Sequence, residues 1–267
     1  NGSNETMKTT GGGGFTHSDG TVKFSSSHGG SNDVYVDDAF FNVIKSGTAR
    51  QSTRATHTIT NDLTVEEAEW SCTSSNVALT VTRHVLIEDG GEIEGYAAAV
   101  SMGTLTIDSG GFYDATSGTT TITAASGAPS NGRCFWGHTS GDMNHNKGLF
   151  YFTGNGAQVE PGTGIAFWDV ETTGDYNPKT AHQKHLNNLT TNGTVTFNGG
   201  GYWLNVGGIY RHKSGTYPNV NSTSDKHSFG AFILEGGTLD LSNISISVGS
   251  FRNIGGTVLG GGAGKIS

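Results

Sequence analysis

Histidine is the residue type here that most invites a chemical role, because ten His residues occur among 267 positions. His138, Asp142 and His145 form the closest group with metal-ligand chemistry, and His182 and His185 follow further on. The segment from 138 to 145, HTSGDMNH, is rich in Gly and Ser, so it does not favour the helical turn that would align these side chains. Nor does it specify a tetrahedral zinc site. We interpret these His residues as exposed turn residues, keep a structural metal as the alternative, and expect no cofactor.

Acidic residues form the second candidate, because glycan-cleaving enzymes use paired carboxyl groups for acid and base chemistry. The candidates in the two acidic stretches are Asp33, Asp37, Asp38, Glu66, Glu67 and Glu69. Asp37 and Asp38 are adjacent and would face opposite ways in a strand. Glu67 and Glu69 could share a face, but no Arg or Lys stands beside them in the sequence. We interpret them as a solvated acidic corner and predict no catalytic set.

Aromatic residues near the polar segments form the third candidate, since an exposed aromatic ring offers an apolar face on which a sugar can stack. Trp203 lies between Tyr202 and Leu204, so one of two alternating faces must point outward if this segment is a strand. Packing in the core or against another subunit is the alternative that we favour. The possible glycan or partner contacts are Trp136, Tyr202, Trp203, Tyr210 and Tyr217.

The two cysteines, Cys72 and Cys134, have no spacing that indicates a metal site. They could pair in an oxidising compartment. We favour buried free thiols.

Composition and charge argue against two classes of partner. The net charge is −8 with only 15 Lys plus Arg, which argues against a nucleic-acid surface. No apolar run approaches the ~20 residues needed to cross a bilayer. The 13 Phe and 8 Tyr residues, together with many Val, Ile and Thr residues, distinguish the chain from disordered sequences. We therefore expect a folded protein with no nucleic-acid partner and no membrane span.

The elements that must position all these side chains are short β-strands. From Phe15 onward, apolar and polar residues alternate between clusters of Gly, Asn, Asp and Ser, which is typical of strands joined by turns. Leu105 and Ile107 are expected to point inward, and Thr104 and Thr106 outward.

A period of about 20 residues runs through the chain. IEDGG at 87–91 recurs as IDSGG at 107–111, and GGTL at 236–239 recurs as GGTV at 255–258. Such a period predicts one coil of a β-solenoid. Gly suits its corners, where the backbone turns with positive φ or passes close to a neighbour. We predict an all-β, right-handed parallel β-helix with Gly-rich corners and irregular loop insertions; an antiparallel sandwich is the alternative. With about twelve coils at ~4.8 Å each, its axis would be roughly 60 Å long.

A longer repeat lies over this period. FTHSDGTVKF at 15–24 matches MNHNKGLFYF at 143–152, with His17 opposite His145 and Gly20 opposite Gly148. FFNV at 40–43 and NDLT at 61–64 recur in the same order as FWDV and NNLT. We predict a flexible lead over 1–14 and a single solenoid over 15–267 that contains duplicated units at about 15–140 and 141–267.

Three segments depart from the strand pattern. Residues 63–70, LTVEEAEW, suit either a turn of helix or a strand with an acidic corner. Residues 175–186 and 211–228 are polar and rich in His and Lys. We expect both polar segments to be loops that bulge from the coils.

The repeated runs resemble those of parallel β-helix proteins from phage virions, such as fibres, tailspikes and capsid appendages, and from bacterial surface adhesins. The runs are GTVKF, FFNVIKSG, NDLTV, GTLTIDSGG, FWDVETTG, NNLTTNGTVTFNGG and GGTLDLS. The resemblance covers most of residues 15–267 and implies a shaft, adhesin or capsid appendage exposed on a virion or cell surface. Its pattern carries no catalytic set that matches positions here. Phe40-Phe41, Phe167-Trp168 and the His-rich insertions depart from it.

These observations predict a non-enzymatic structural or assembly protein, namely a virion-exposed appendage or a capsid-decorating component. The expected partners are copies of the same chain or other proteins of a virion or cell surface. The expected location is a virion surface or the extracellular or cell surface. One alternative is an adhesin that binds a host surface glycan, and a second is a polysaccharide-degrading β-helix enzyme.

Overall fold

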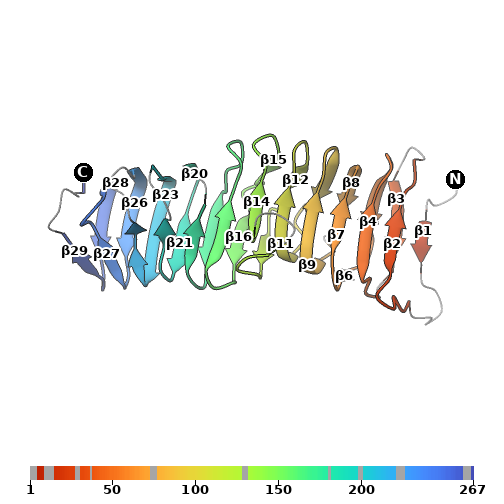
Figure 1. Cartoon of the computed structure of the whole chain (residues 1–267), viewed down its shortest axis with the longest axis horizontal. Coiled ribbons are helices and arrows are strands. Elements are labelled where there is room, and N and C mark those ends of the chain that lie inside the picture. The colour runs from red at the N-terminus through yellow and green to blue at the C-terminus, as the bar shows by residue number, and fades with distance from the viewer. Residues whose placement is uncertain are drawn as a thin grey trace.

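The computed structural model describes residues 5–8, 15–27, 31–36, 38–72, 77–127, 132–179, 182–197, 201–220, 226–260 and 266–267. Across these ranges the chain is all β and has no helix. Its strands stack in parallel as a β-solenoid of about ten turns (Figure 1). The predicted β-solenoid is therefore confirmed.

One face of the solenoid is sheet A, in which each strand pairs in parallel with the next strand along the axis. Its strands are β1 (Glu5–Lys8), β3 (Ser31–Tyr35), β5 (Arg50–Thr53), β8 (Ala68–Ser71), β10 (Gly91–Glu94), β12 (Phe112–Asp114) and β15 (Asp142–Asn144).

Most remaining strands belong to sheet B, whose longest members continue through a corner of the coil. For example, β9 pairs with β6 at one end and with β7 at the other. The strands of sheet B are β2 (Thr21–Phe24), β4 (Asn42–Lys45), β6 (His57–Ile59), β7 (Leu63–Val65), β9 (Leu79–Ile87), β11 (Val100–Ile107), β13 (Thr119–Ile122), β14 (Phe135–Gly137), β16 (Leu149–Phe152), β17 (Ala157–Glu160), β18 (Asp169–Thr172), β19 (Tyr176–Pro178), β20 (His182–His185), β21 (Leu189–Asn192), β23 (Trp203–Ser214), β26 (Lys226–Leu234) and β28 (Ser245–Asn253). Two smaller sheets contain β22 (Thr196–Phe197) with β25 (Asn219–Val220), and β24 (Thr216–Tyr217) with β27 (Thr238–Asp240) and β29 (Thr257–Leu259).

The predicted period is the length of one turn, but turn length varies. Ile107 pairs with Ile87, 20 residues earlier, and both are fully buried. Phe229 pairs with Val248 after 19 residues, whereas Leu105 pairs with Phe135 after 30. The prediction of about twelve coils is wrong, because longer turns use up chain and leave about ten. At ~4.8 Å per turn the axis is about 48 Å long.

The Gly-Gly corners use both properties that make Gly suitable there. Gly90 and Gly110 have φ angles of +79° and +75°, a region that other residues rarely adopt. The following Gly111 approaches the previous turn so closely that a Cβ would lie 2.6 Å from the carbonyl oxygen of Ile87. Each corner therefore turns sharply while staying within hydrogen-bonding reach of its neighbour.

The inward and outward positions along the strands agree with those predicted from the sequence. The difference is that some of the outward side chains are covered by other parts of the chain. Phe24, Phe150 and Phe152 are buried, and Val22 is partly buried against the core. Thr104 and Thr106 alternate with the core residues as predicted, yet the side chains of both are buried rather than exposed. Thr104 Oγ1 lies 2.7 Å from the Nδ1 atom of His84, and Gly127 of the 30-residue turn lies close against Thr104.

The duplicated blocks carry the same local contacts. His17 stacks on Phe41 with ring centroids 5.5 Å apart, and His145 stacks on Trp168 at 5.3 Å. Each of these His residues accepts a hydrogen bond from the backbone of the Gly three positions later, at 2.8 Å and 2.9 Å.

The polar segments predicted to be loops are largely strands of the coil, so that prediction is wrong. Residues 175–186 contain β19 and β20, and residues 211–228 contain parts of β23, β24, β25 and β26. Gln183, His185 and His212 point inward and are buried, which is why the segments do not show apolar alternation. Residues 180–181 and 221–225 lie outside the described residues.

Two other segments, residues 63–70 and residues 5–8, also form strands. Residues 63–70 form β7 and the start of β8 on either side of an acidic corner, not a helix. Residues 5–8, within the predicted flexible lead, form β1 and pair with β3. The rest of the predicted lead, residues 1–4 and 9–14, lies outside the described part of the chain.

Candidate functional site

The histidines considered for a metal site are not brought together. His138 Nδ1 lies 2.8 Å from Ser140 Oγ, and the backbone N–H of Lys147 donates to His145 Nδ1 at 2.9 Å. His182 is exposed, whereas His185 is buried. Among the described residues, no three His, Cys, Asp or Glu side chains are placed to hold a metal ion.

The core contains four buried histidines that the sequence analysis did not predict: His57, His185, His212 and His227. Desolvation lowers the pKa of His185 to about 3 and that of His227 to about 4. The His185 ring stacks on Phe167 at 5.7 Å, and the His227 ring lies 4.8 Å from that of Phe197. These neutral imidazoles therefore pack as aromatic rings. Strand parity could have found three of the four, because His57, His212 and His227 stand two residues from the buried Ile59, Tyr210 and Phe229 in the same strands.

The acidic candidates are scattered, with one exception. The backbone N–H of Phe15 donates to Asp38 Oδ2 at 2.7 Å, and Glu66 pairs with Lys23 at 3.2 Å in an exposed position. The main-chain carbonyl of Glu67 accepts a hydrogen bond from Lys45 Nζ at 3.1 Å. Asp33 pairs with Arg54 at 3.0 Å. Asp37 lies outside the described residues. Glu69 belongs to a cluster that the sequence analysis missed.

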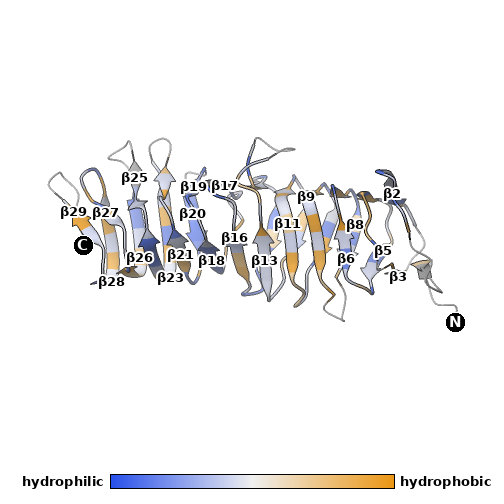
Figure 2. Ribbon diagram, turned by 90° about the horizontal axis from the view of Figure 1, so that it is seen from below, coloured by the Kyte–Doolittle hydropathy of each residue, from blue (hydrophilic) through white to orange (hydrophobic). Residues whose placement is uncertain are grey.

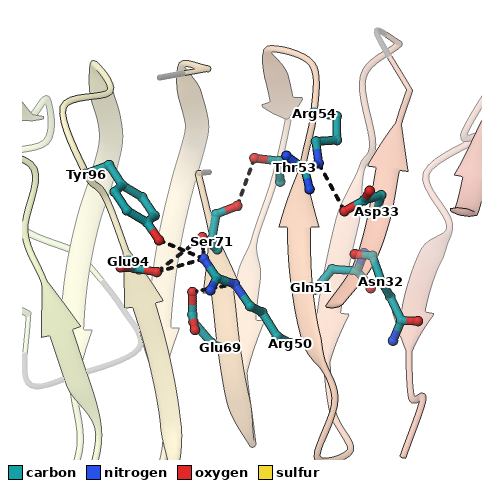
Figure 3. A network of polar contacts seen from close by, with 10 residues as sticks. All are labelled: Asn32, Asp33, Arg50, Gln51, Thr53, Arg54, Glu69, Ser71, Glu94 and Tyr96. Atoms are coloured by element: carbon teal, nitrogen blue, oxygen red, sulfur yellow. Dashed lines mark hydrogen bonds and ion pairs between the residues drawn. The ribbon is translucent and has the colours of Figure 1, made fainter. Parts of the chain in front are cut away.

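That cluster joins three neighbouring strands of sheet A (Figure 3). The guanidinium of Arg50, on β5, contacts Glu69 Oε1 of β8 at 2.9 Å and Glu94 Oε2 of β10 at 3.0 Å. It also donates to Ser71 Oγ at 2.7 Å and to Tyr96 Oη at 2.9 Å. One arginine therefore ties together side chains from three successive turns.

The electrostatics of the cluster favour a protonated carboxyl group. Desolvation, followed by a hydrogen bond to Glu94, raises the pKa of Glu69 to about 8, although Arg50 opposes the shift. Desolvation and the charge of Glu94 also raise the pKa values of Glu92 and Asp114 on the same face. One arginine does not neutralise this row, so protonation of Glu69 relieves the repulsion.

This geometry suits a clamp between turns better than acid–base catalysis. In glycosidases the two carboxyl groups stand about 5 Å or more apart, with the sugar or a water between them. Here Glu69 and Glu94 bond to each other and to the same guanidinium. Neither residue lines either of the two grooves described below.

Two of the five aromatic candidates are core residues, which corrects their assignment as surface contacts. Tyr210 and Tyr217 are fully buried, because they occupy inward positions of β23 and β24, and their ring centroids are 4.9 Å apart. Tyr202 is partly buried beside Phe197. Trp136 is partly exposed. Trp203 is 47% exposed on the outer side of β23, while Leu204 points inward as predicted for one of the two faces.

Each of the two candidate tryptophans, Trp136 and Trp203, stands beside a groove. The groove at Trp203 has a volume of about 450 Å³ and is lined by β23, β26, β28 and Ser267. The groove at Trp136 is smaller, about 170 Å³, and includes His138 and Glu160. Glu160 is paired with Arg133 at 2.6 Å.

Both cysteines are buried and free, which confirms the interpretation that we favoured. Burial raises the pKa values of Cys72 and Cys134 to about 12. They are therefore protonated thiols that pack in the core at neutral pH.

No family model, no curated protein and no solved structure matches this chain. Over the described ranges, no helix is long and apolar enough to cross a membrane. The function must therefore be argued from the geometry.

Proposed function

We propose that this chain is a non-enzymatic structural protein, a rigid shaft segment within a larger assembly on a virion or cell surface. Its parallel pairing continues along the axis from β1 to β29, and one apolar cluster runs from Phe24 to Ile246. Neighbouring turns of such a solenoid stabilise one another. A structure of this kind suits a spacer of fixed length.

The observation that carries the proposal is where apolar residues are exposed. Of the five large hydrophobic residues exposed in the described chain, four lie in or beside the last turn: Ile254, Val258, Leu259 and Ile266, at 36% to 56%. Figure 2 shows β29 as hydrophobic at the C-terminal end of the solenoid. Exposed apolar residues gathered at one end of a solenoid indicate an interaction surface.

The core ladders indicate what covers this last-turn surface. Tyr217, Leu239 and Val258 are paired in register, and the first two are fully buried. Val258 continues the row but is 39% exposed, because no described strand lies beyond it. A further turn of β-solenoid would extend the row and pair with the open edge of β29. We infer that a turn from a second copy of the chain occupies this position.

Light scattering over a concentration series tests the assembly. The parent chain is expected to form oligomers, and Val258→Lys combined with Leu259→Lys is expected to yield monomers. The matched control adds the same two charges on turns away from both ends, as Thr82→Lys with Ser117→Lys, where both residues are exposed. A parent chain that stays monomeric at every concentration would overturn the proposed assembly, as would equal loss of association in the control.

Turnover is tested separately on a panel of polysaccharides by measuring the release of new chain ends. No release is expected. Release that disappears in Glu69→Gln would replace the structural proposal with an enzyme that uses the Arg50 cluster.

A further inference from the structure

Trp203 is the one large apolar side chain among the five exposed ones that lies away from the last turn. In sheet B, Trp203 is paired in register with His182 of the preceding turn and Lys226 of the following turn, and Ser245 comes next. The His182 ring meets the Trp203 ring edge-on at 5.0 Å. The Lys226 ammonium lies over the Trp203 ring, 5.3 Å from its centroid. This row forms an aromatic platform between two polar side chains.

The groove beside this platform has free hydrogen-bonding groups. Asn205, Ser228, Ser245 and Ser247 line it. Their side chains make no hydrogen bond to the described residues, whereas the polar groups of the Arg50 cluster are bonded to one another. Small serine side chains also leave room next to the tryptophan. A ligand with many hydroxyl groups fits such a lining.

The charge of the groove is the opposite of that of the chain. Lys226 lines it, and Lys184 lies one turn away at the position paired with Asn205. Neither ammonium pairs with a carboxylate in the described residues, whereas Lys23 and Lys213 do. No acidic side chain is present among the described residues that line the groove. On a chain of net charge −8, an unpaired cation beside an aromatic ring favours a ligand that carries negative charge.

We propose that this Trp203 groove binds an acidic glycan, a sugar chain that carries carboxylate groups. The Lys226 side chain swings off the Trp203 ring and pairs with a sugar carboxylate, and the uncovered ring receives the apolar face of a pyranose. Asn205, Ser228 and Ser247 bond to its hydroxyl groups. A nucleic acid fits less well, because it needs several cations along a strand, and only Lys184 and Lys226 are present in these rows.

Titration calorimetry tests the proposal with oligogalacturonide, alginate and hyaluronan oligosaccharides, and with a neutral malto-oligosaccharide of similar length. We expect at least one carboxylated oligosaccharide to bind and the neutral one to bind at least about tenfold more weakly. Trp203→Ala is expected to weaken binding by about tenfold or more, as loss of a stacking partner does. Lys226→Gln is expected to weaken binding of the acidic oligosaccharide and to reduce its salt dependence.

Trp136→Ala is the matched control, because that tryptophan also borders a groove, but one with Glu160 and no lysine in its lining. It should bind like the parent chain. Equal loss in Trp136→Ala, equal affinity for the neutral oligosaccharide, or binding of none of the three acidic ones would each overturn the proposal. Tighter Trp203-dependent binding of a single-stranded oligonucleotide would overturn it in favour of a nucleic acid. Because Ser245, Ser247 and Ser267 of the last turn line the groove whereas Val258 and Leu259 do not, the titration is repeated on the chain with Val258→Lys and Leu259→Lys. Unchanged binding in that variant separates glycan binding from assembly.

Discussion

Placing a carboxyl group at position 107 is the most direct test of the stacked core. The Ile107 side chain is fully buried and lies in register between Ile87 on the preceding turn and Gly137 on the next. Ile107→Asp removes an apolar side chain whose burial contributes about 1.5–3 kcal/mol. The new carboxyl group has no partner in this row, so it must remain neutral in the folded state.

The size of the effect at pH 7 follows from that neutrality. An aspartic acid with an ordinary pKa of about 3.9 costs roughly 4 kcal/mol to keep protonated at pH 7. Together with the lost apolar burial, the expected destabilisation is on the order of 6 kcal/mol, a large part of the ~5–15 kcal/mol typical of folded domains. Because the folded-state pKa is raised, this electrostatic share is present at pH 7 and fades as the pH falls toward 4.

Urea unfolding followed by circular dichroism at pH 7 and pH 4 measures this difference against the parent chain. Ile107→Asn, which does not titrate, should show the same deficit at both pH values. Thr82→Asp, at an exposed position in sheet B, should change stability by no more than about 0.5 kcal/mol. An Ile107→Asp chain that unfolds at the parent's midpoint at pH 7 would refute the burial and the one-turn register.

Three other predictions concern stability. The pKa of Glu69 is raised to about 8 in the folded state, so the folded chain keeps a proton that the unfolded chain releases above about pH 4.5. The free energy of unfolding should therefore fall as the pH rises from 5 to 8. Glu69→Gln should flatten that slope in a series of thermal melts, and Glu66→Gln, in an exposed pair, should not. Conversely, the lowered pKa of His185, about 3, should reduce stability as the pH falls below 6.5, by on the order of 4 kcal/mol near pH 3. His185→Phe should diminish this loss in acid unfolding curves, whereas an unchanged curve, or an equal effect of His138→Phe at the surface, would contradict it. Gly111→Ala should cost about 1–3 kcal/mol, because its Cβ would press on the Ile87 carbonyl, while Gly164→Ala, which meets open space, should differ little in melting temperature.

The sequence predicts the parity and period of this fold because both arise from contacts one turn apart. Ile87 and Ile107 match in type since they are neighbours in one core row. The number of turns was overestimated because the 30-residue turn between Leu105 and Phe135 carries no mark of its extra length. The polar strands β19 and β20 were mistaken for loops because Gln183 and His185 take inward positions that apolar residues usually occupy.

Most of the Arg50 cluster was missed because partners were sought beside Glu69 in the sequence. Gln51 pairs with Trp70 and Trp70 with Ile93, which places Arg50 next to Glu69 across the turn and Glu92 beyond it. A search at intervals of one turn would have found the arginine. The hydrogen bonds of Ser71 and Tyr96 could not be found in that way, because they depend on side-chain reach rather than register.

Two polar rows on the outside of the solenoid differ in whether their charged groups already have partners. In the row of Arg50 and Glu69, the cation is held by carboxylates and hydroxyls of neighbouring turns, so a ligand would have to break existing bonds to enter. In the row of Trp203 and Lys226, the ammonium lies over a ring face and has no carboxylate partner among the described residues, and a carboxylate can replace the ring contact with a stronger one. The outside of the solenoid therefore combines a region of sheet A that joins turns with a region of sheet B that leaves its polar groups available. An assembly that places copies end to end would repeat the Trp203 groove along its length, and binding to a polymeric glycan would gain from that repetition.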